Sequence, residues 1–316
     1  MPHLDPVALF FVLGLAAGLA RADLKVPPAI YEFTSIVLML SIGLRAGSQL
    51  AQQDLGRIAL DIVGVFALGL LLPLLAYPVL RYVGKLDRPD AASVAAHYGA
   101  ISVATFAVAL SFMADRQIAF EPYAPLFVVL FDVPAILTGI VLARGLGGGS
   151  GTRDWRGLGR QVFLGKSVVL LLGGLVIGWI TGPAGLEPIA PFFFDLFKGV
   201  LALFLLEMGL IASAHLSGMM RHGLFMVAFG IVTPVVFATI GIGFATVMGL
   251  SPGGSILLAV LAGSASYISV PAAMRAAVPE ANPALPLTAS LAITFPFNIL
   301  VGIPLYHRMV MAWIGA

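Results

Sequence analysis

Apolar runs of about 20 residues recur along the 316-residue chain, and this feature constrains its fold more than any other. A helix of about 20 residues crosses the roughly 30 Å hydrocarbon core of a bilayer. In lipid every backbone polar group needs an internal partner, so only helices and closed barrels span a membrane. The runs are continuous rather than alternating, which favours helices. We therefore predict an all-α integral membrane protein.

Composition supports this prediction and excludes other classes of protein. Hydrophobic residues make up 60% of the chain and charged residues 10%, whereas soluble domains carry about 25% charged residues. The chain has no Cys, so disulfides and thiolate metal sites are excluded. A net charge of +2 is too small to suggest a nucleic-acid partner. No zinc-protease, Walker or nucleophile-elbow motif occurs, so we expect no enzyme.

We predict ten transmembrane helices with short connections. The expected spans are 6–20, 30–46, 58–80, 91–113, 122–143, 161–181, 196–213, 223–249, 254–277 and 287–312. The first run lacks a basic start and a cleavage site, so it is expected to be a retained span. A polar, Gly-rich linker at about 144–160 divides the single membrane domain into halves at 1–150 and 151–316.

The two halves resemble each other in sequence. The segment IGLRAGSQL at 42–50 matches MGLIASAHL at 208–216, an offset of 166 residues. The pattern Gly-x-x-Ser-x-x-Thr from Gly99 matches Gly-x-x-Ser-x-x-Ser from Gly263, an offset of 164 residues. A repeat with an odd number of spans is inverted relative to its copy, as in many transporters. The chain is therefore predicted to hold two inverted five-helix repeats.

The basic residues of the loops predict the orientation in the membrane, because Lys and Arg are enriched in cytoplasmic loops. The side that carries both termini has five of them: Arg45, Arg57, Arg116, Lys198 and Arg308. The other side has twelve: Arg21, Lys25, Arg81, Lys85, Arg88, Arg144, Arg153, Arg156, Arg160, Lys166, Arg221 and Arg275. Both termini are thus expected outside the cytoplasm. Lys198 is expected to pair with Asp195 at the membrane interface.

The fourth and ninth spans carry the main functional signal. They read HYGAISVAT at 97–105 and GSASYISVP at 263–271, with Gly and hydroxyl residues about a dozen positions into each span. At 1.5 Å per residue, these segments lie roughly 16–18 Å deep, near the membrane centre. Gly, Ser and Pro271 favour a break, after which each helix restarts with free N–H groups. In inverted repeats these positive helix ends face each other and suit a small anion. Close helix packing through small residues remains the alternative.

Four polar residues within apolar spans are candidate ligands for a cation. Asp132 precedes Pro134 in the fifth span, where an intramembrane carboxylate is costly and usually functional. Thr294 and Asn298 occupy the corresponding region of the tenth span. Glu207, in the seventh span, could bind a cation or carry a proton. For Asp132, a helix cap or a polar contact between helices is the alternative interpretation.

At these residues the chain resembles the sodium-dependent bicarbonate symporter family (SbtA-type). The family's GAVSGST, FMDIPAL, SSSDISGP, IPSANP and GIPLF are similar to GAISVAT at 99–105, FDVPAI at 131–136, SASYISVP at 264–271, VPEANP at 278–283 and GIPLY at 302–306. The likeness extends from the first span to the last. Asp132 stands at the position of the family's Asp.

The resemblance implies sodium-coupled bicarbonate uptake by a core domain that moves against a gate domain in a homotrimer of the plasma (inner) membrane. It also implies a PII-like cytoplasmic regulator. The residues expected to form the anion site are Gly99, Ser102, Val103, Ala104, Thr105, Gly263, Ser264, Ser266, Tyr267, Ile268 and Ser269. Tyr267 replaces a family Asp, and a phenol cannot supply a carboxylate to sodium. Another small carboxylate or inorganic anion, or a non-transporting sensor or scaffold, is the alternative.

Overall fold

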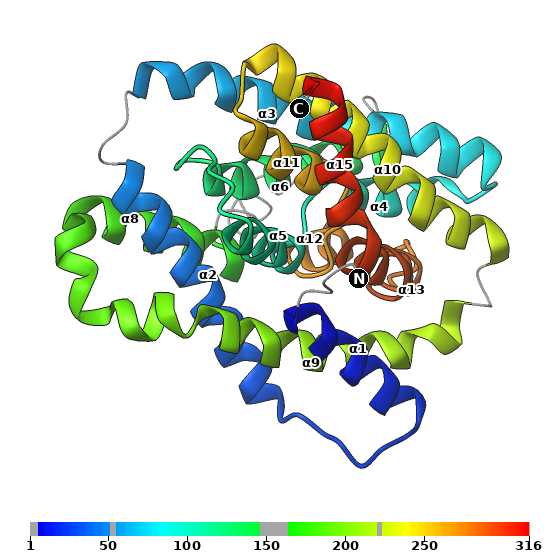
Figure 1. Cartoon of the computed structure of the whole chain (residues 1–316). Coiled ribbons are helices and arrows are strands. Elements are labelled where there is room, and N and C mark those ends of the chain that lie inside the picture. Colours follow the sequence, from blue (N-terminus) through cyan, green and yellow to red (C-terminus); the bar gives the residue numbers. More distant parts are fainter. Residues whose placement is uncertain (1–5, 51–54, 146–163, 220–222, 316) are drawn as a thin grey trace.

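The computed structural model describes residues 6–50, 55–145, 164–219 and 223–315, and these ranges contain helices and no strand. The long helices of the first half are α1 (Pro6–Leu19), α2 (Pro28–Leu50), α3 (Leu55–Pro78), α4 (Arg88–Gly99), α5 (Val103–Asp115) and α6 (Pro125–Arg144). Those of the second half are α8 (Lys166–Leu186), α9 (Phe197–Met219), α10 (Gly223–Met248), α11 (Pro252–Ala262) and α12 (Ser269–Ala277). The last segment contains α13 (Ala284–Thr288), α14 (Phe295–Phe297) and α15 (Ile303–Ile314). Figure 1 shows their arrangement.

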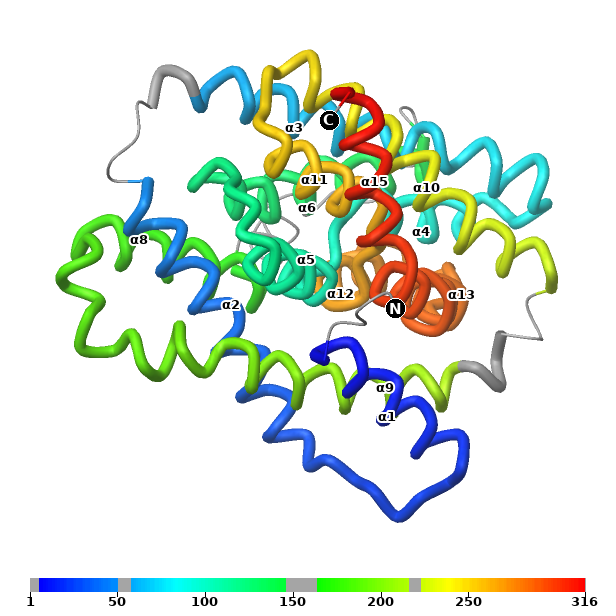
Figure 2. Tube along the Cα trace, in the orientation of Figure 1, coloured from blue at the N-terminus to red at the C-terminus, as the bar shows by residue number. Residues whose placement is uncertain are grey.

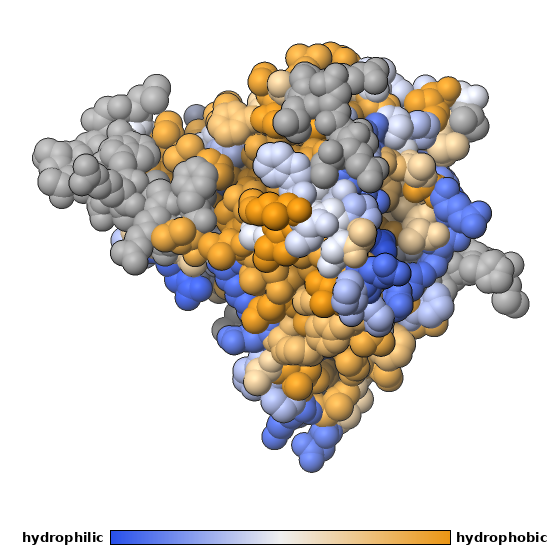
Figure 3. Space-filling model, turned by 90° about the vertical axis from the view of Figure 1, so that its left-hand side faces the viewer, coloured by the Kyte–Doolittle hydropathy of each residue, from blue (hydrophilic) through white to orange (hydrophobic). Residues whose placement is uncertain are grey.

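The predicted membrane class is confirmed in its coarse form. Eight helical segments of the described residues are long and apolar enough to cross a membrane, and Pro6–Leu19 and Pro252–Ala262 are shorter apolar helices. Apolar residues cover most of the face seen in Figure 3, and hydrophilic residues gather in separate patches. Most of the expected linker, 146–163, lies outside the described residues, as does the start of the expected span at 161–181.

The helices form two groups. The peripheral group consists of α1, α2, α8 and α9, in which α1 packs on α9 and α2 packs on α8. The central group contains α3 to α6 and α10 to α15. Figure 2 traces the peripheral group along the left and the bottom of the molecule, beside the central helices.

Glycines hold the peripheral pairs together. A Cβ atom on Gly47 of α2 would lie 1.9 Å from the carbonyl oxygen of Leu175 in α8. A Cβ atom on Gly14 of α1 would lie 1.9 Å from the carbonyl oxygen of Leu206 in α9. Both distances are far below van der Waals contact, so only glycine permits these approaches. Small residues allow such close backbone packing between membrane helices.

Two helices of the central group begin alike. Asp87 accepts a hydrogen bond from the Asp90 N–H (2.9 Å) and caps α4, which has a proline in its first turn. Ser251 accepts one from the Gly254 N–H (3.1 Å) and caps α11, which begins at Pro252. A side-chain acceptor followed by proline is a strong helix start, because proline has no N–H to leave unpaired. Both helices then end at the predicted breaks, at 100–102 and 263–268.

The last segment departs from a simple helix. The expected span at 287–312 lies within 284–314, but it contains π-helical turns at Ala289–Thr294 and Asn298–Gly302. A π turn interrupts the regular hydrogen-bond ladder and often marks a functional region. These turns present Thr294 and Asn298 to the central group, where both side chains are buried.

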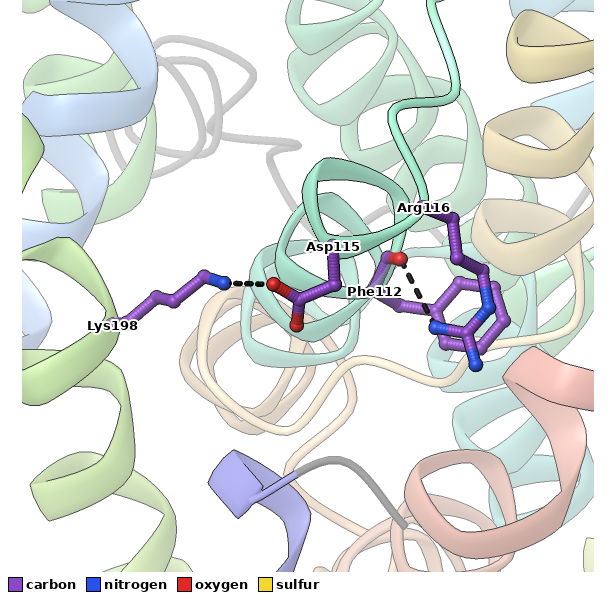
Figure 4. A network of polar contacts seen from close by, with 4 residues as sticks. All are labelled: Phe112, Asp115, Arg116 and Lys198. Atoms are coloured by element: carbon purple, nitrogen blue, oxygen red, sulfur yellow. Dashed lines mark hydrogen bonds and ion pairs between the residues drawn. The ribbon is translucent and has the colours of Figure 1, made fainter. Parts of the chain in front are cut away.

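A salt bridge joins the two groups at one end of the molecule, and it corrects one prediction. Lys198 of α9 pairs with Asp115 at the end of α5 (Figure 4), not with Asp195 as predicted. Beside it, the Arg116 guanidinium lies 3.6 Å from the ring centre of Phe112. Both partners of the salt bridge are partly exposed, with 47% and 39% of their side chains accessible. The pair therefore links the two groups at a partly exposed position.

Candidate functional site

The break in the fourth predicted span leaves a helix N-terminus with free donors. Ser102 precedes α5, and its Oγ accepts a hydrogen bond from the Thr105 N–H (3.2 Å). No hydrogen bond within the described residues uses the amides of Val103 or Ala104. Unpaired N–H groups and the helix dipole favour an anion at such an end. This is the arrangement predicted from the Gly and hydroxyl pattern.

The break in the ninth predicted span begins at Gly263. A Cβ atom at this position would lie 2.8 Å from the carbonyl oxygen of Pro234 in α10, which explains the need for glycine. The helix restarts at Ser269 after Ile268, which provides no side-chain cap. Pro271 falls within the first turn of α12, where a missing N–H costs nothing. The break therefore follows from the local sequence.

The two breaks are in direct contact. The Ser102 N–H donates to the Ser264 Oγ (3.1 Å), and the Ser266 N–H donates to the carbonyl oxygen of His97 (2.8 Å). The Ser264 hydroxyl in turn donates to the Leu261 carbonyl (2.8 Å). These contacts join segments 162 residues apart in the sequence. In Figure 1, α5 and α12 are both seen near the centre of the molecule.

Two buried hydroxyls at this crossing have no hydrogen-bond partner within the described residues. They are Thr105 Oγ1, on a residue 1% exposed, and the phenol of Tyr267, on a residue 8% exposed. The Tyr267 side chain approaches Ser102, and its ring packs edge-on against Phe295 at 5.5 Å between centroids. Buried polar atoms are nearly always paired. Unpaired hydroxyls beside free amides are therefore suited to a polar ligand.

A small cavity lies between this crossing and the peripheral group. Its volume is about 10 Å³, which is room for roughly one water molecule. The central group contributes Val103, Ala104, Ala107 and Ile268, and the peripheral group contributes Ser35, Leu38, Met39 and Phe204. The sequence did not reveal Ser35 or Phe204, because nothing in their own spans marks them. An anion with four non-hydrogen atoms is larger than this cavity, so it would fit only if the two groups moved apart.

Asp132 lies on the other side of the crossing. Its Oδ1 accepts a hydrogen bond from the Ile101 N–H (3.3 Å), and its carboxylate interacts with the Ser269 hydroxyl at the start of α12. The residue is 3% exposed and borders a larger cavity of about 290 Å³. Asp132 therefore contacts both breaks and retains access to a space that an ion could enter.

Thr294 and Asn298 have other partners. Thr294 Oγ1 donates to the Gly230 carbonyl (2.8 Å) and contacts the Tyr98 hydroxyl (2.7 Å). The Asn298 amide nitrogen donates to the Gly263 carbonyl (2.8 Å), and its oxygen accepts from the Tyr306 hydroxyl. Asn298 thus stabilises the end of α11, where the ninth span breaks. Within the described residues, Asp132 makes no hydrogen bond with either of these residues.

Glu207 belongs to the peripheral group. It is 7% exposed, and its Oε2 has no hydrogen-bond partner within the described residues. Tyr31 of α2 lies within the electrostatic range of Glu207 and stacks on Phe204 at 5.5 Å between ring centroids. Phe204 lines the small cavity, so Glu207 lies one helical turn from its wall. Within the described residues, no three His, Asp or Glu side chains cluster as a metal site would require.

Comparison with known proteins adds a family to this geometry. The family model of the Na+-dependent bicarbonate transporter superfamily matches residues 6–311, nearly the whole chain. None of the curated proteins compared with the chain is significantly similar to it. The match includes both breaks and every candidate site residue. It supports the expectation that the chain is not an enzyme.

Proposed function

Because the chain belongs to the Na+-dependent bicarbonate transporter superfamily, we propose that it takes up bicarbonate together with Na+ by alternating access. The observation that carries this proposal is the direct contact between the two broken helices, at Ser102–Ser264 and His97–Ser266. Broken helices that meet inside a membrane protein provide unpaired backbone groups where transporters bind small ions. The site is built from both halves of the chain.

We assign the bicarbonate site to the start of α5. The free amides of Val103 and Ala104 would donate to the anion, and the hydroxyls of Thr105 and Tyr267 would add donors. Hydrogen bonds to a charged group each contribute about 1.5–3 kcal/mol. Ser266 and Ser269, whose hydroxyls are 2.9 Å apart, belong to the facing break. The remaining predicted residues of this site shape the two breaks.

Among the four predicted cation ligands, Asp132 has the best support as a sodium ligand. It alone contacts both breaks and borders a cavity. Sodium prefers hard oxygen ligands, and carboxylates in membrane interiors are normally paired with a cation. Thr294 and Asn298 would act by shaping the end of α11. Glu207 would act from the peripheral group, as the second carboxylate available to a cation.

The helix contacts support the proposed repeat. When the first and second halves are exchanged, the pair α1–α9 becomes α8–α2, and both pairs are closely packed. The similar starts of α4 and α11 and the two breaks follow the same exchange. We therefore count α1 and the α11–α12 segment as the remaining two of ten spans. The peripheral group would be the gate and the central group the core.

Alternating access requires the two groups to move relative to each other. The small cavity between them, about 10 Å³, cannot hold bicarbonate as it stands. Movement of the core past the gate would open it, and the partly exposed Lys198–Asp115 pair would break and reform in that movement. The homotrimer, the inner-membrane location and the PII-like regulator are carried over from the family resemblance.

Uptake into proteoliposomes tests the proposal. The purified chain is reconstituted, and labelled bicarbonate is followed under an inward gradient of Na+ or of choline. We expect accumulation only with Na+. Uptake that is equal in choline would contradict sodium coupling, and no uptake in either salt would contradict bicarbonate transport. If labelled bicarbonate is not taken up, uptake of labelled nitrate, formate and acetate under the same gradients identifies another anion as the substrate.

A further inference from the structure

Part of the wall of the larger cavity is formed by residues outside the proposed transport site. Its volume is about 290 Å³, enough for several water molecules, each of which occupies about 30 Å³ in the liquid. One wall is formed by Asp132, Ile136 and the first turn of α12. The opposite wall is the start of α8, residues 165–168. This second wall belongs to the peripheral group and carries the positive charge of Lys166.

The start of α8 has the properties of an anion-binding helix end. Gly165 precedes the helix and provides no side-chain cap, and Lys166 is its first residue. The first-turn N–H groups of α8 have no partner within the helix. Lys166, an exposed cation, lines the cavity beside them. Ser167 also lines the cavity; it is only 4% exposed and makes no hydrogen bond within the described residues. A hydroxyl on a cavity wall that no described group pairs with is free to donate a hydrogen bond to a ligand in that cavity.

The charges around the cavity favour an anion. Lys166 contributes one positive charge, and the two helix ends together contribute about one more. Asp132 contributes one negative charge, and it already interacts with Ser269 and the Ile101 amide. Among the described residues that line the cavity, the balance is therefore positive, with the excess on the α8 wall. A cation would be repelled from that wall unless it remained beside Asp132.

Ile268 connects this cavity to the transport site. It lines both the large cavity and the small cavity beside Val103 and Ala104. Ile268 therefore forms part of the boundary between the large cavity and the cavity beside the proposed bicarbonate site. The large cavity is a suitable place for an anion immediately before it enters that site or after it leaves.

We propose that the cavity between α8 and α12 is a second binding site for a small inorganic anion, held by Lys166, the Ser167 hydroxyl and the first-turn amides of α8. This inference rests on the proposed anion transport, since Ile268 places the cavity next to the transport site. The site serves as an antechamber on the Lys166 side of the membrane. Lys166 raises the local anion concentration there, as fixed charge does in a partly enclosed cleft.

The absence of native cysteine allows a direct test. Ala272 is exposed and lines the cavity, so Ala272→Cys introduces the only thiol of the chain. Its reaction rates are measured in gluconate buffer with an anionic (sulfonatoethyl) and a cationic (trimethylammonioethyl) methanethiosulfonate, each divided by its rate with free cysteine. We expect the anionic reagent to be favoured, and Lys166→Gln to lower this preference about tenfold. Bicarbonate, nitrate or chloride should slow the modification.

Two variants control for folding and for general charge. Lys166→Arg retains the charge and should retain the preference, whereas Lys25→Gln removes an exposed charge from the loop between α1 and α2 and should change nothing. Equal normalised rates for the two reagents, or no protection by any of the three anions, would overturn the anion site. If the preference and protection persist in a chain that shows no bicarbonate uptake, the cavity site is supported and the proposed function fails.

Discussion

Asp132 illustrates how one side chain can satisfy two interpretations. From the sequence, Asp132 is either a cation ligand or a polar structural contact. In the structure its carboxylate accepts a hydrogen bond from the Ile101 amide and interacts with the Ser269 hydroxyl. The same carboxylate borders the large cavity, so the contact does not exclude a ligand role. A carboxylate in a membrane interior is stabilised by donors and by a nearby cation together.

Asp132→Asn separates these roles, because it keeps the shape and removes the charge. We expect the Na+ concentration for half-maximal uptake to rise at least about tenfold, roughly 1.4 kcal/mol, with the protein still folded. The control is Asp61→Asn, which changes another buried carboxylate that instead accepts a hydrogen bond from Tyr123 (2.6 Å). Asp61→Asn should leave the sodium response unchanged. An unchanged response in Asp132→Asn would limit Asp132 to a structural role.

The partners of single residues were the hardest feature to predict. The sequence places Asn298 near Asp132, because Asn298 lies in the corresponding region of the tenth span. The structure instead bonds Asn298 to Gly263 and Tyr306. The partners of Asn298 depend on its orientation in the π-helical turn that begins at this residue. No local sequence pattern specifies such a turn. Lys198 likewise pairs with Asp115, 83 residues away, rather than with the nearby Asp195.

At the scale of helices, the predictions are closer to the structure. The sequence predicts breaks within 97–105 and 263–271 from Gly, hydroxyl residues and Pro271, and the helices are interrupted there, at 100–102 and 263–268. These features act locally, through backbone freedom and side-chain capping, so one sequence is sufficient to identify them. The α2 helix continues beyond the predicted end at 46, at least to Leu50, the last described residue before the gap at 51–54.

The α2–α8 contact can be tested at one glycine. Gly47→Ala would place a methyl group 1.9 Å from the Leu175 carbonyl, and forcing the helices apart should cost about 1–3 kcal/mol. We expect a lower thermal unfolding temperature in detergent. Gly173→Ala on α8 is the matched control, since a Cβ atom there has nothing within 4 Å. Alanine favours helix more than glycine does, so the control should be neutral or stabilising. Equal melting of both variants would refute the close contact.

At the scale of the whole molecule, orientation remains a prediction from the loop charges. Twelve of the 17 Lys and Arg residues lie on the side that is expected to face the cytoplasm. A reporter that is active only in the cytoplasm should be silent when fused after Ala316 and active when inserted into the linker at 144–160. A signal from the C-terminal fusion, with a silent linker insertion, would reverse the orientation.

The arrangement of the helices could be predicted only in part. Periodicity and length identify the spans, and the internal match suggests a repeat. The division into a peripheral and a central group depends on which distant helices pack together. That packing involves backbone approaches such as Gly14 on Leu206 and Gly47 on Leu175, which a single sequence does not distinguish from other small-residue contacts.

The central claim is that one bicarbonate ion is bound by both halves of the chain, and a double-mutant cycle on bicarbonate affinity tests it most directly. Affinity is measured by calorimetry for the wild type, Thr105→Val, Tyr267→Phe and the double variant, at saturating Na+, because these two hydroxyls come from the two halves of the chain. Each single change should weaken binding by roughly 1–3 kcal/mol. The account predicts that the double variant departs from the sum by about 0.5 kcal/mol or more. Simple additivity, or single variants that bind as tightly as the wild type, would contradict a shared site.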